Sequence, residues 1–318
     1  MVKKYVAILC LLVISVAVRA QFDPQIGQYM YLPTAYNPAA AGDGDLMKVA
    51  GMHRMQFIGI RNAPMSTYFS FSSPFQIGKT KHGAGVRFLN DSYGLFTNQA
   101  VYGQYAYRQK LGKGYLAAGV DLGFVNVGFQ GSKVNLDSLS ESEYFDKNDE
   151  AIPMQDKSGM QFDMGIGVWY ATPTWWVALS YSHVTQPTIE WDDKSSIKLV
   201  GTLYGGGGYT FKLKYHKEWQ LAASAFVMSD FRSWDVNLTL MCHYKERYRW
   251  GLGYRIAGSI NLLVSIDVIS GLTIGYTCEL PHNNLLLESA GTHELMISYG
   301  FNILKPRRTN KYKSVRYL

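Results

Sequence analysis

Three short motifs contain residue types that could do chemistry, but each departs from the pattern that its chemistry needs. Residues 78–80 (Gly-Lys-Thr) resemble the end of a phosphate-binding loop, yet Ser73 stands where the first glycine is required. Residues 195–198 (Ser-Ser-Ile-Lys) have the spacing of a serine nucleophile and its lysine, without companion motifs. Residues 146–150 offer carboxylates to calcium but lack the glycine and the terminal glutamate of a calcium-binding loop. We interpret the three as a turn, a chance match and a solvated acidic loop.

Histidine and cysteine usage gives no signal of a metal site or a nucleophilic enzyme. The 7 histidines are scattered, and none has the spacing of a zinc ligand pair. Cys10 lies in an N-terminal apolar stretch, whereas Cys242 and Cys278 lie in strand-like patterns, which favours free thiols. No clustered acid, base and nucleophile can be assembled, as an outer-membrane hydrolase would require. We therefore predict no catalytic residue, no metal, no cofactor, no small-molecule substrate and no enzymatic activity.

The formal charge of +7 is concentrated at the two ends of the chain. Lys3, Lys4 and Arg19 lie within the first 20 residues. The last 14 residues contain six basic residues and no acidic one, namely Lys305, Arg307, Arg308, Lys311, Lys313 and Arg316. The body between them keeps 22 of the 31 basic residues against all 24 acidic ones. We predict no nucleic-acid partner for this near-neutral body.

The first 20 residues have the pattern of an export signal. Lys3 and Lys4 form a charged start, residues 6–18 an apolar core, and residues 18–20 (Val-Arg-Ala) a small-residue cleavage site. We expect the mature chain to begin at Gln21. No run of 18 apolar residues follows, so the mature chain has no predicted transmembrane helix.

The rest of the chain alternates between large apolar and small or polar residues. Residues 294–303 show the pattern: Leu295, Ile297 and Tyr299 fall on one face, and polar or small residues fall on the other. Residues 21–45 are irregular, and we expect a short extended segment packed in or under the strands that follow. The fourteen expected strands are 46–58, 65–74, 83–91, 98–109, 114–130, 158–171, 174–183, 197–211, 218–228, 233–246, 249–257, 259–268, 271–280 and 292–304.

Strand number and loop length favour an outer-membrane β-barrel over a secreted β-sandwich or propeller. The count is even, as in most single-chain bacterial barrels, and dyad alternation with the apolar face outward recurs along the chain. The long connections 131–157, 184–196 and 281–291 all follow odd-numbered strands, so they share one end of the barrel. We predict an all-β transmembrane antiparallel barrel over 46–304, lying in the Gram-negative outer membrane and in contact with its lipid.

The basic tail, 305–318, continues past the last expected strand on the periplasmic side. It is either a solvated, disordered tail or a docking element for an acidic periplasmic partner, and the sequence leaves both open. The six cations given above are the candidate partner-binding residues.

The N-terminal third resembles the PorP/SprF family of type IX secretion system outer-membrane proteins, and it is closest to the PorP branch. The resemblance covers about 21–110. It rests on the following residues: Asp23-Pro24, Gln28-Tyr29, Asn37-Pro38-Ala39-Ala40-Ala41-Gly42, Arg54, Gln56-Phe57, Gly59, Ala63-Pro64, Gly83, Gly85, Asn90-Asp91 and Tyr105-Ala106-Tyr107-Arg108. Phe57 stands where tryptophan is common in the family.

The resemblance implies a non-enzymatic part of a secretion machine. It implies contacts with a periplasmic ring of lipoprotein and partner subunits and with a peptidoglycan-linked protein. The expected cargo is proteins with C-terminal sorting domains, and in some relatives gliding adhesins. The alternative is a passive or hydrophobic-substrate transporter, such as a fourteen-stranded porin with an N-terminal plug. The state of the lumen separates the two hypotheses.

Overall fold

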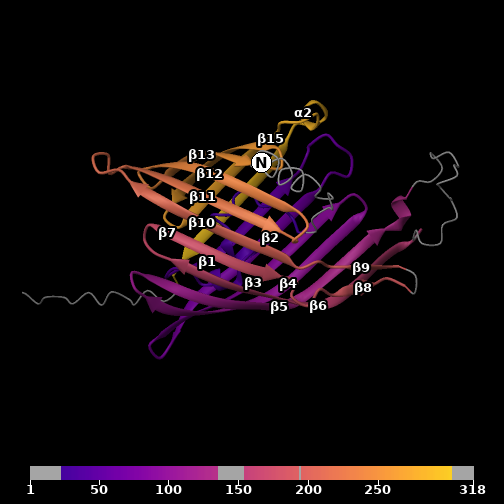
Figure 1. The fold of residues 1–318 in the computed structure, drawn as a ribbon, viewed down its shortest axis with the longest axis horizontal. Helices are drawn as coiled ribbons and strands as arrows, with labels where there is room; N and C mark the ends of the chain where they lie inside the picture. Colours follow the sequence, from indigo (N-terminus) through magenta and orange to yellow (C-terminus); the bar gives the residue numbers. More distant parts are fainter. Residues whose placement is uncertain (1–22, 135–153, 193–194, 303–318) are drawn as a thin grey trace, which may run out of the picture.

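The computed structural model describes residues 23–134, 154–192 and 195–302, in which fourteen strands close an antiparallel β-barrel (Figure 1). Neighbours in the chain are neighbours in the barrel, and β1 pairs with β16 to close it. The predicted all-β transmembrane barrel of about 14 strands is confirmed. The barrel strands are β1 (Met47–Met55), β2 (Met65–Ile77), β3 (Thr80–Tyr93), β4 (Phe96–Leu111), β5 (Gly114–Gln130), β6 (Asp156–Ala171), β7 (Trp175–Ser182), β10 (Thr202–Lys212), β11 (Trp219–Ser229), β12 (Trp234–Tyr244), β13 (Tyr248–Arg255), β14 (Ser259–Ile269), β15 (Leu272–Pro281) and β16 (Thr292–Phe301).

Side-chain exposure follows the predicted alternation. Along β16, Leu295, Ile297 and Tyr299 are exposed on the outer surface, whereas Glu294 and Met296 are buried inside. Large apolar side chains are exposed in this way on every strand of the barrel except β11, where smaller or half-exposed residues face outward. An apolar outer surface and a polar inner one is the arrangement that a membrane-spanning barrel requires. No helix among the described residues is long and apolar enough to cross a membrane.

Connection lengths distinguish the two ends of the barrel. The connections 56–64, 131–155, 183–201 and 282–291 lie at one end, and tight turns such as 78–79 and 112–113 lie at the other. Short turns face the periplasm in such barrels. The long-loop end, on the right in Figure 1, carries the hairpin of β8 (Thr188–Glu190) and β9 (Ser196–Lys198), η3 (Gly131–Lys133) and α2 (Leu285–Glu288). We call it the outer end.

Two expected strand boundaries are wrong. The eighth expected strand, 197–211, joins two elements, because its start belongs to β9 and the barrel strand β10 begins only at Thr202. The first expected strand, 46–58, runs past the end of β1 at Met55, because Phe57 adopts a left-handed backbone with φ 45°. Alternation of residue types continues through both points, so it could not reveal either break.

Residues 23–45, which we call the lumen segment, run inside the barrel. The segment contains two short turns, η1 (Pro33–Ala35) and η2 (Pro38–Ala40). Tyr29 and Leu32 have no exposed surface at all. Side chains or backbone of all fourteen barrel strands contact the segment. The segment therefore crosses the full width of the lumen.

Candidate functional site

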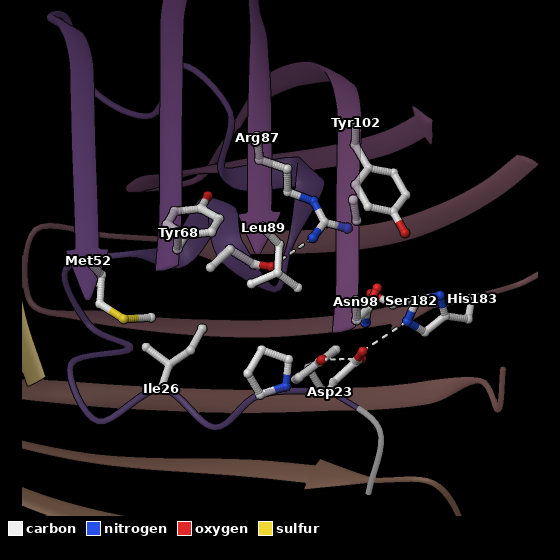
Figure 2. A pocket seen from close by; sticks show the side chains of 14 residues that line it. Asp23, Ile26, Met52, Tyr68, Arg87, Leu89, Asn98, Tyr102, Ser182 and His183 are labelled. Atoms are coloured by element: carbon white, nitrogen blue, oxygen red, sulfur yellow. Dashed lines mark hydrogen bonds and ion pairs between the residues drawn. The ribbon is translucent and has the colours of Figure 1, made fainter. Parts of the chain in front are cut away.

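The outer end of the lumen segment is fixed by a histidine between two carboxylates. His183, just past the outer end of β7, contacts Asp23 of the segment through Nε2 at 2.9 Å (Figure 2). Its Nδ1 contacts Asp163 of β6 at 2.7 Å. Tyr102 donates to Asp163 at 2.6 Å, and Tyr204 donates to Asp23. Both ring nitrogens therefore face acceptors, which requires the doubly protonated imidazolium. We call this cluster the outer latch.

The electrostatics of the outer latch agree with its geometry. Burial lowers the pKa of His183, but Asp23 and Asp163 outweigh burial and raise it to about 10. Burial raises the pKa of Asp23, but the charge and hydrogen bond of His183 outweigh burial and lower it to about 2. The pair is therefore charged at neutral pH. A buried pair is costly to break, because removing one partner leaves the other charge unpaired.

Glu294 of β16 fixes the segment through its backbone. Its carboxylate accepts hydrogen bonds from the backbone N–H groups of Gly27 and Gln28, each at 2.8 Å. Arg54 of β1 lies between Glu294, at 3.3 Å, and Glu279 of β15, at 2.6 Å. All three charged side chains are buried, so the arginine compensates the carboxylates that hold the segment.

Wall side chains also bind the carbonyl oxygens of the segment. Arg108 of β4 donates to Ala41 at 2.9 Å and to Ala39 at 3.4 Å, and pairs with Asp43 at 3.0 Å. Four more carbonyls accept from the wall: Tyr31 from Lys48, Thr34 from Gln104, Ala35 from Arg87 and Tyr36 from Ser180. These contacts satisfy backbone groups that water cannot reach. The wall therefore binds the main chain of the segment as well as its side chains.

Inward-facing glycines make room for the segment. A Cβ at Gly119 of β5 would lie 2.5 Å from the Cα of Ala39, and backbone cannot move aside as a flexible side chain can. A Cβ at Gly83 would collide with the Ala41 carbonyl, and one at Gly167 with the Asn37 side chain. These glycines explain the small residues on the inner face: a larger residue there would displace the lumen segment.

The lumen segment leaves a small cavity beside the outer latch. It measures about 30 Å³, which is room for one or two waters. Asp23, Arg87, Asn98 and His183 line it, as Figure 2 shows. The buried carbonyl oxygen of the Asn98 side chain has no hydrogen-bond partner and is suited to hold such a water.

At the outer end, the β8–β9 hairpin forms a second layer against one side of the inner wall. The β8–β9 hairpin buries Ile189 and Leu199 completely against the inward-facing Val125 and Val127 of β5. Trp191 fixes the hairpin by donating a hydrogen bond to the carbonyl of Val127 at 2.9 Å. The β8–β9 hairpin therefore adds a second covering at the outer end of the barrel, in addition to the lumen segment.

The structure places the sequence-predicted site residues as follows. The six tail cations Lys305, Arg307, Arg308, Lys311, Lys313 and Arg316, and the acidic loop 146–150, lie outside the described residues. Residues 78–80 form the turn between β2 and β3, and 195–198 lie in the β8–β9 hairpin. Cys242 and Cys278 are free thiols. No group of three His, Cys, Asp or Glu side chains in the described ranges is arranged to hold a metal.

Sequence reasoning did not find the residues that hold the lumen segment. Glu294 was recognised only as a member of the polar face of its strand, and His183 received no role. The available signal was a charged residue at an inward position of an otherwise apolar strand pattern, as for Arg54, Asp121 and Glu279. Such a residue predicts a buried partner but does not identify it.

A closed antiparallel barrel with an apolar outer surface and a charged lumen defines an integral outer-membrane β-barrel protein. Residues 18–299 match the family described as type IX secretion system membrane protein PorP/SprF. The chain therefore belongs to the PorP/SprF family of type IX secretion membrane proteins.

Several solved structures have a similar barrel at low sequence identity. The Ralstonia pickettii toluene transporter TbuX is 13% identical, with 90% of this chain and 96% of that chain covered and a TM-score of 0.47. The CymD monoaromatic hydrocarbon channel is 11% identical, covering 90% and 95%, with a TM-score of 0.48. The Acinetobacter baumannii outer membrane protein Omp33 is 7% identical, covering 82% and 100%, with a TM-score of 0.46. Similarity this low carries no argument about function. No curated protein matches the chain.

Proposed function

We propose that the protein is a non-enzymatic outer-membrane component of the type IX secretion system. It supports export of proteins with C-terminal sorting domains, gliding adhesins among them, through contacts with periplasmic subunits of the machine. The observation that carries the proposal is the family match over residues 18–299. The occupied lumen is consistent with it, because a barrel filled by its own chain is unsuited to passive diffusion.

The periplasmic end supplies a surface suited to acidic partners. Nine cations on its turns and strand ends are exposed: Lys79, Lys81, Lys110, Lys113, Lys212, Lys214, Lys217, Lys245 and Arg247. Glu218 and Glu246 are exposed acidic residues on the same turns. The described chain leaves the barrel at this end, so the six tail cations add to the same side of the membrane. We propose that this surface binds the ring lipoprotein, its partner subunit and a peptidoglycan-linked protein.

Export through a cleaved signal is part of the proposal. Asp23 is buried within the lumen, and an uncleaved apolar core, residues 6–18, would end only five residues upstream. Removal before Gln21 frees the segment to enter the barrel. The N-terminal residue of protein purified from outer membranes tests this: Gln21 is expected, and a start at Met1 would contradict it.

Co-purification from mildly solubilised outer membranes tests the secretion role. We expect the periplasmic subunits to co-purify, and deletion of the protein to stop secretion of cargo with C-terminal sorting domains. Charge reversal at the periplasmic end (Lys214→Glu with Lys217→Glu), or removal of 305–318, should weaken the complex and make it more salt-sensitive. Reversal at the outer end (Lys133→Glu with Lys198→Glu) is the matched control and should change nothing.

Two outcomes would contradict the proposal. The first is normal secretion in a strain that lacks the protein. The second is uptake of a hydrophobic solute by the purified protein with no periplasmic subunit attached, which would favour the transporter alternative.

A further inference from the structure

Without the lumen segment, the barrel wall would enclose a wide space lined by both polar and apolar side chains. A circular barrel of fourteen strands, spaced about 4.8 Å and tilted about 40°, has a backbone diameter of about 28 Å. Large side chains such as Tyr68 and Phe226 enter this space, but several that face it are small, including Ala106, Ala117, Ala178, Ser180 and Ser224. Such a wall does not fill its own interior, unlike the wall of an eight-stranded barrel.

The lumen segment is attached to the wall without becoming part of the sheet. The backbone-to-backbone hydrogen bonds of residues 23–45 are internal, such as that from Tyr31 N–H to the Gln28 carbonyl. Hydrogen bonds with the wall involve a side chain on at least one partner, as at Glu294 and Arg108. Removing the segment would therefore break no strand pairing, and the barrel would stay closed around the vacated space.

The segment is tethered at one end and latched at the other. Its inner end continues at the periplasmic side into β1. Its outer end is held by the ion pairs of Asp23 with His183 and of His183 with Asp163. Once the outer latch opens and the contacts with Glu294 and the other wall side chains are broken in turn, the segment can swing out toward the periplasm while it remains attached to the barrel.

We propose that the barrel is an ion-conducting channel held shut by its own lumen segment, residues 23–45, and opened by release of the outer latch. This inference does not depend on the secretion role. Ion conduction by the purified full-length protein is its direct readout, and no periplasmic partner is needed.

The first test compares two glycines in planar lipid bilayers. Gly119→Leu places a side chain where the backbone of Ala39 lies, whereas Gly103→Leu adds the same side chain on the outer surface, where the nearest atom is 3.9 Å away. We expect a closed wild type, a closed Gly103→Leu variant, and mean conductance about tenfold or more higher for Gly119→Leu. His183→Gln, which removes the latch without adding bulk, is the second opening variant. Each protein is first shown to be folded by its heat-modifiable electrophoretic mobility.

A reversible disulfide then shows whether the segment is the gate. The hydroxyl oxygens of Thr34 in the segment and Ser70 in β2 lie 3.3 Å apart, so these two side chains face each other and are the pair chosen for a disulfide. With Thr34→Cys and Ser70→Cys added to an opening variant, oxidation should abolish conduction and reduction should restore it. The proposal is overturned if folded opening variants stay silent, if wild type conducts as they do, or if oxidation leaves conduction unchanged.

Discussion

Replacing Glu294 by glutamine should loosen the start of the lumen segment while leaving the barrel folded. The side chain keeps its size, but the carboxylate that accepts from Gly27 and Gln28 becomes a neutral amide. Only one acceptor oxygen then remains for two donors. The contact of Arg54 with residue 294, 3.3 Å in the wild type, is weakened, but Arg54 keeps the shorter contact with Glu279 at 2.6 Å, so no charge is left without a partner.

The expected cost follows from the two backbone hydrogen bonds. Hydrogen bonds to charged groups are worth about 1.5–3 kcal/mol and neutral ones about 0.5–1.5 kcal/mol, so each bond loses about 1 kcal/mol. Adding the weakened contact with Arg54 gives a total of about 2–3 kcal/mol for the buried site. At 1.4 kcal/mol per factor of ten, opening of the segment becomes about 30–150 times more frequent.

Hydrogen–deuterium exchange measured by mass spectrometry separates the segment from the wall. Peptides from 26–36 should exchange faster by the factor given, whereas peptides from β16 should keep wild-type protection. Glu288→Gln, on the exposed outer helix α2, is the matched control and should change neither. If protection of 26–36 is unchanged in Glu294→Gln, or if β16 loses protection equally, Glu294 does not hold the segment as described.

Two further predictions concern the wall and the outer latch. Ile297→Lys, near mid-strand on the lipid face, should destabilise the folded barrel in bilayers by about 2–4 kcal/mol. Phe301→Lys, at the strand end, should cost only about 0–1 kcal/mol. Equal costs of the two variants in urea titrations would contradict the membrane orientation. The latch should also respond to pH. The pKa of His183 is raised to about 10. Its stabilisation of the outer latch is therefore complete below about pH 6.5 and disappears as pH rises toward 10. The pKa of Asp23 is lowered to about 2, so its contribution disappears only as pH falls below about 4. Protease sensitivity of 23–45 should rise between pH 7 and 10, and the rise should be absent in His183→Gln.

Most of the wall could be predicted because its signal is local. Alternation along a strand such as 292–304 records which residues face lipid, and the structure confirms that orientation for Ile297. The wrong strand boundaries lie where the alternation continues although the strand that the chain pairs with changes. The start of β9 and the start of β10 lie on one continuous alternation, although only β10 joins the barrel.

The lumen contacts could not be predicted because they join distant parts of the chain. Asp23 and His183 are 160 positions apart, and Gly27 and Glu294 are 267 apart. Composition showed that the inner face is rich in glycine, but not that the space belongs to residues 23–45. Gly119 becomes interpretable only when Ala39 is placed against it.

The way in which the lumen is filled argues for reversible occupancy. A barrel can be closed permanently by large side chains of its own wall, as small barrels are. Here the wall instead carries buried charges, such as Arg54 and Arg108, that bind a separate segment through its backbone. Replacing buried ion pairs by apolar residues of similar volume often leaves a protein equally stable or more stable, so stability alone does not favour charged groups here. Charged contacts do hold the lumen segment in a defined position, and a binding partner or a change of pH can break them. The lumen therefore has the chemistry of a closed gate rather than of a permanent core.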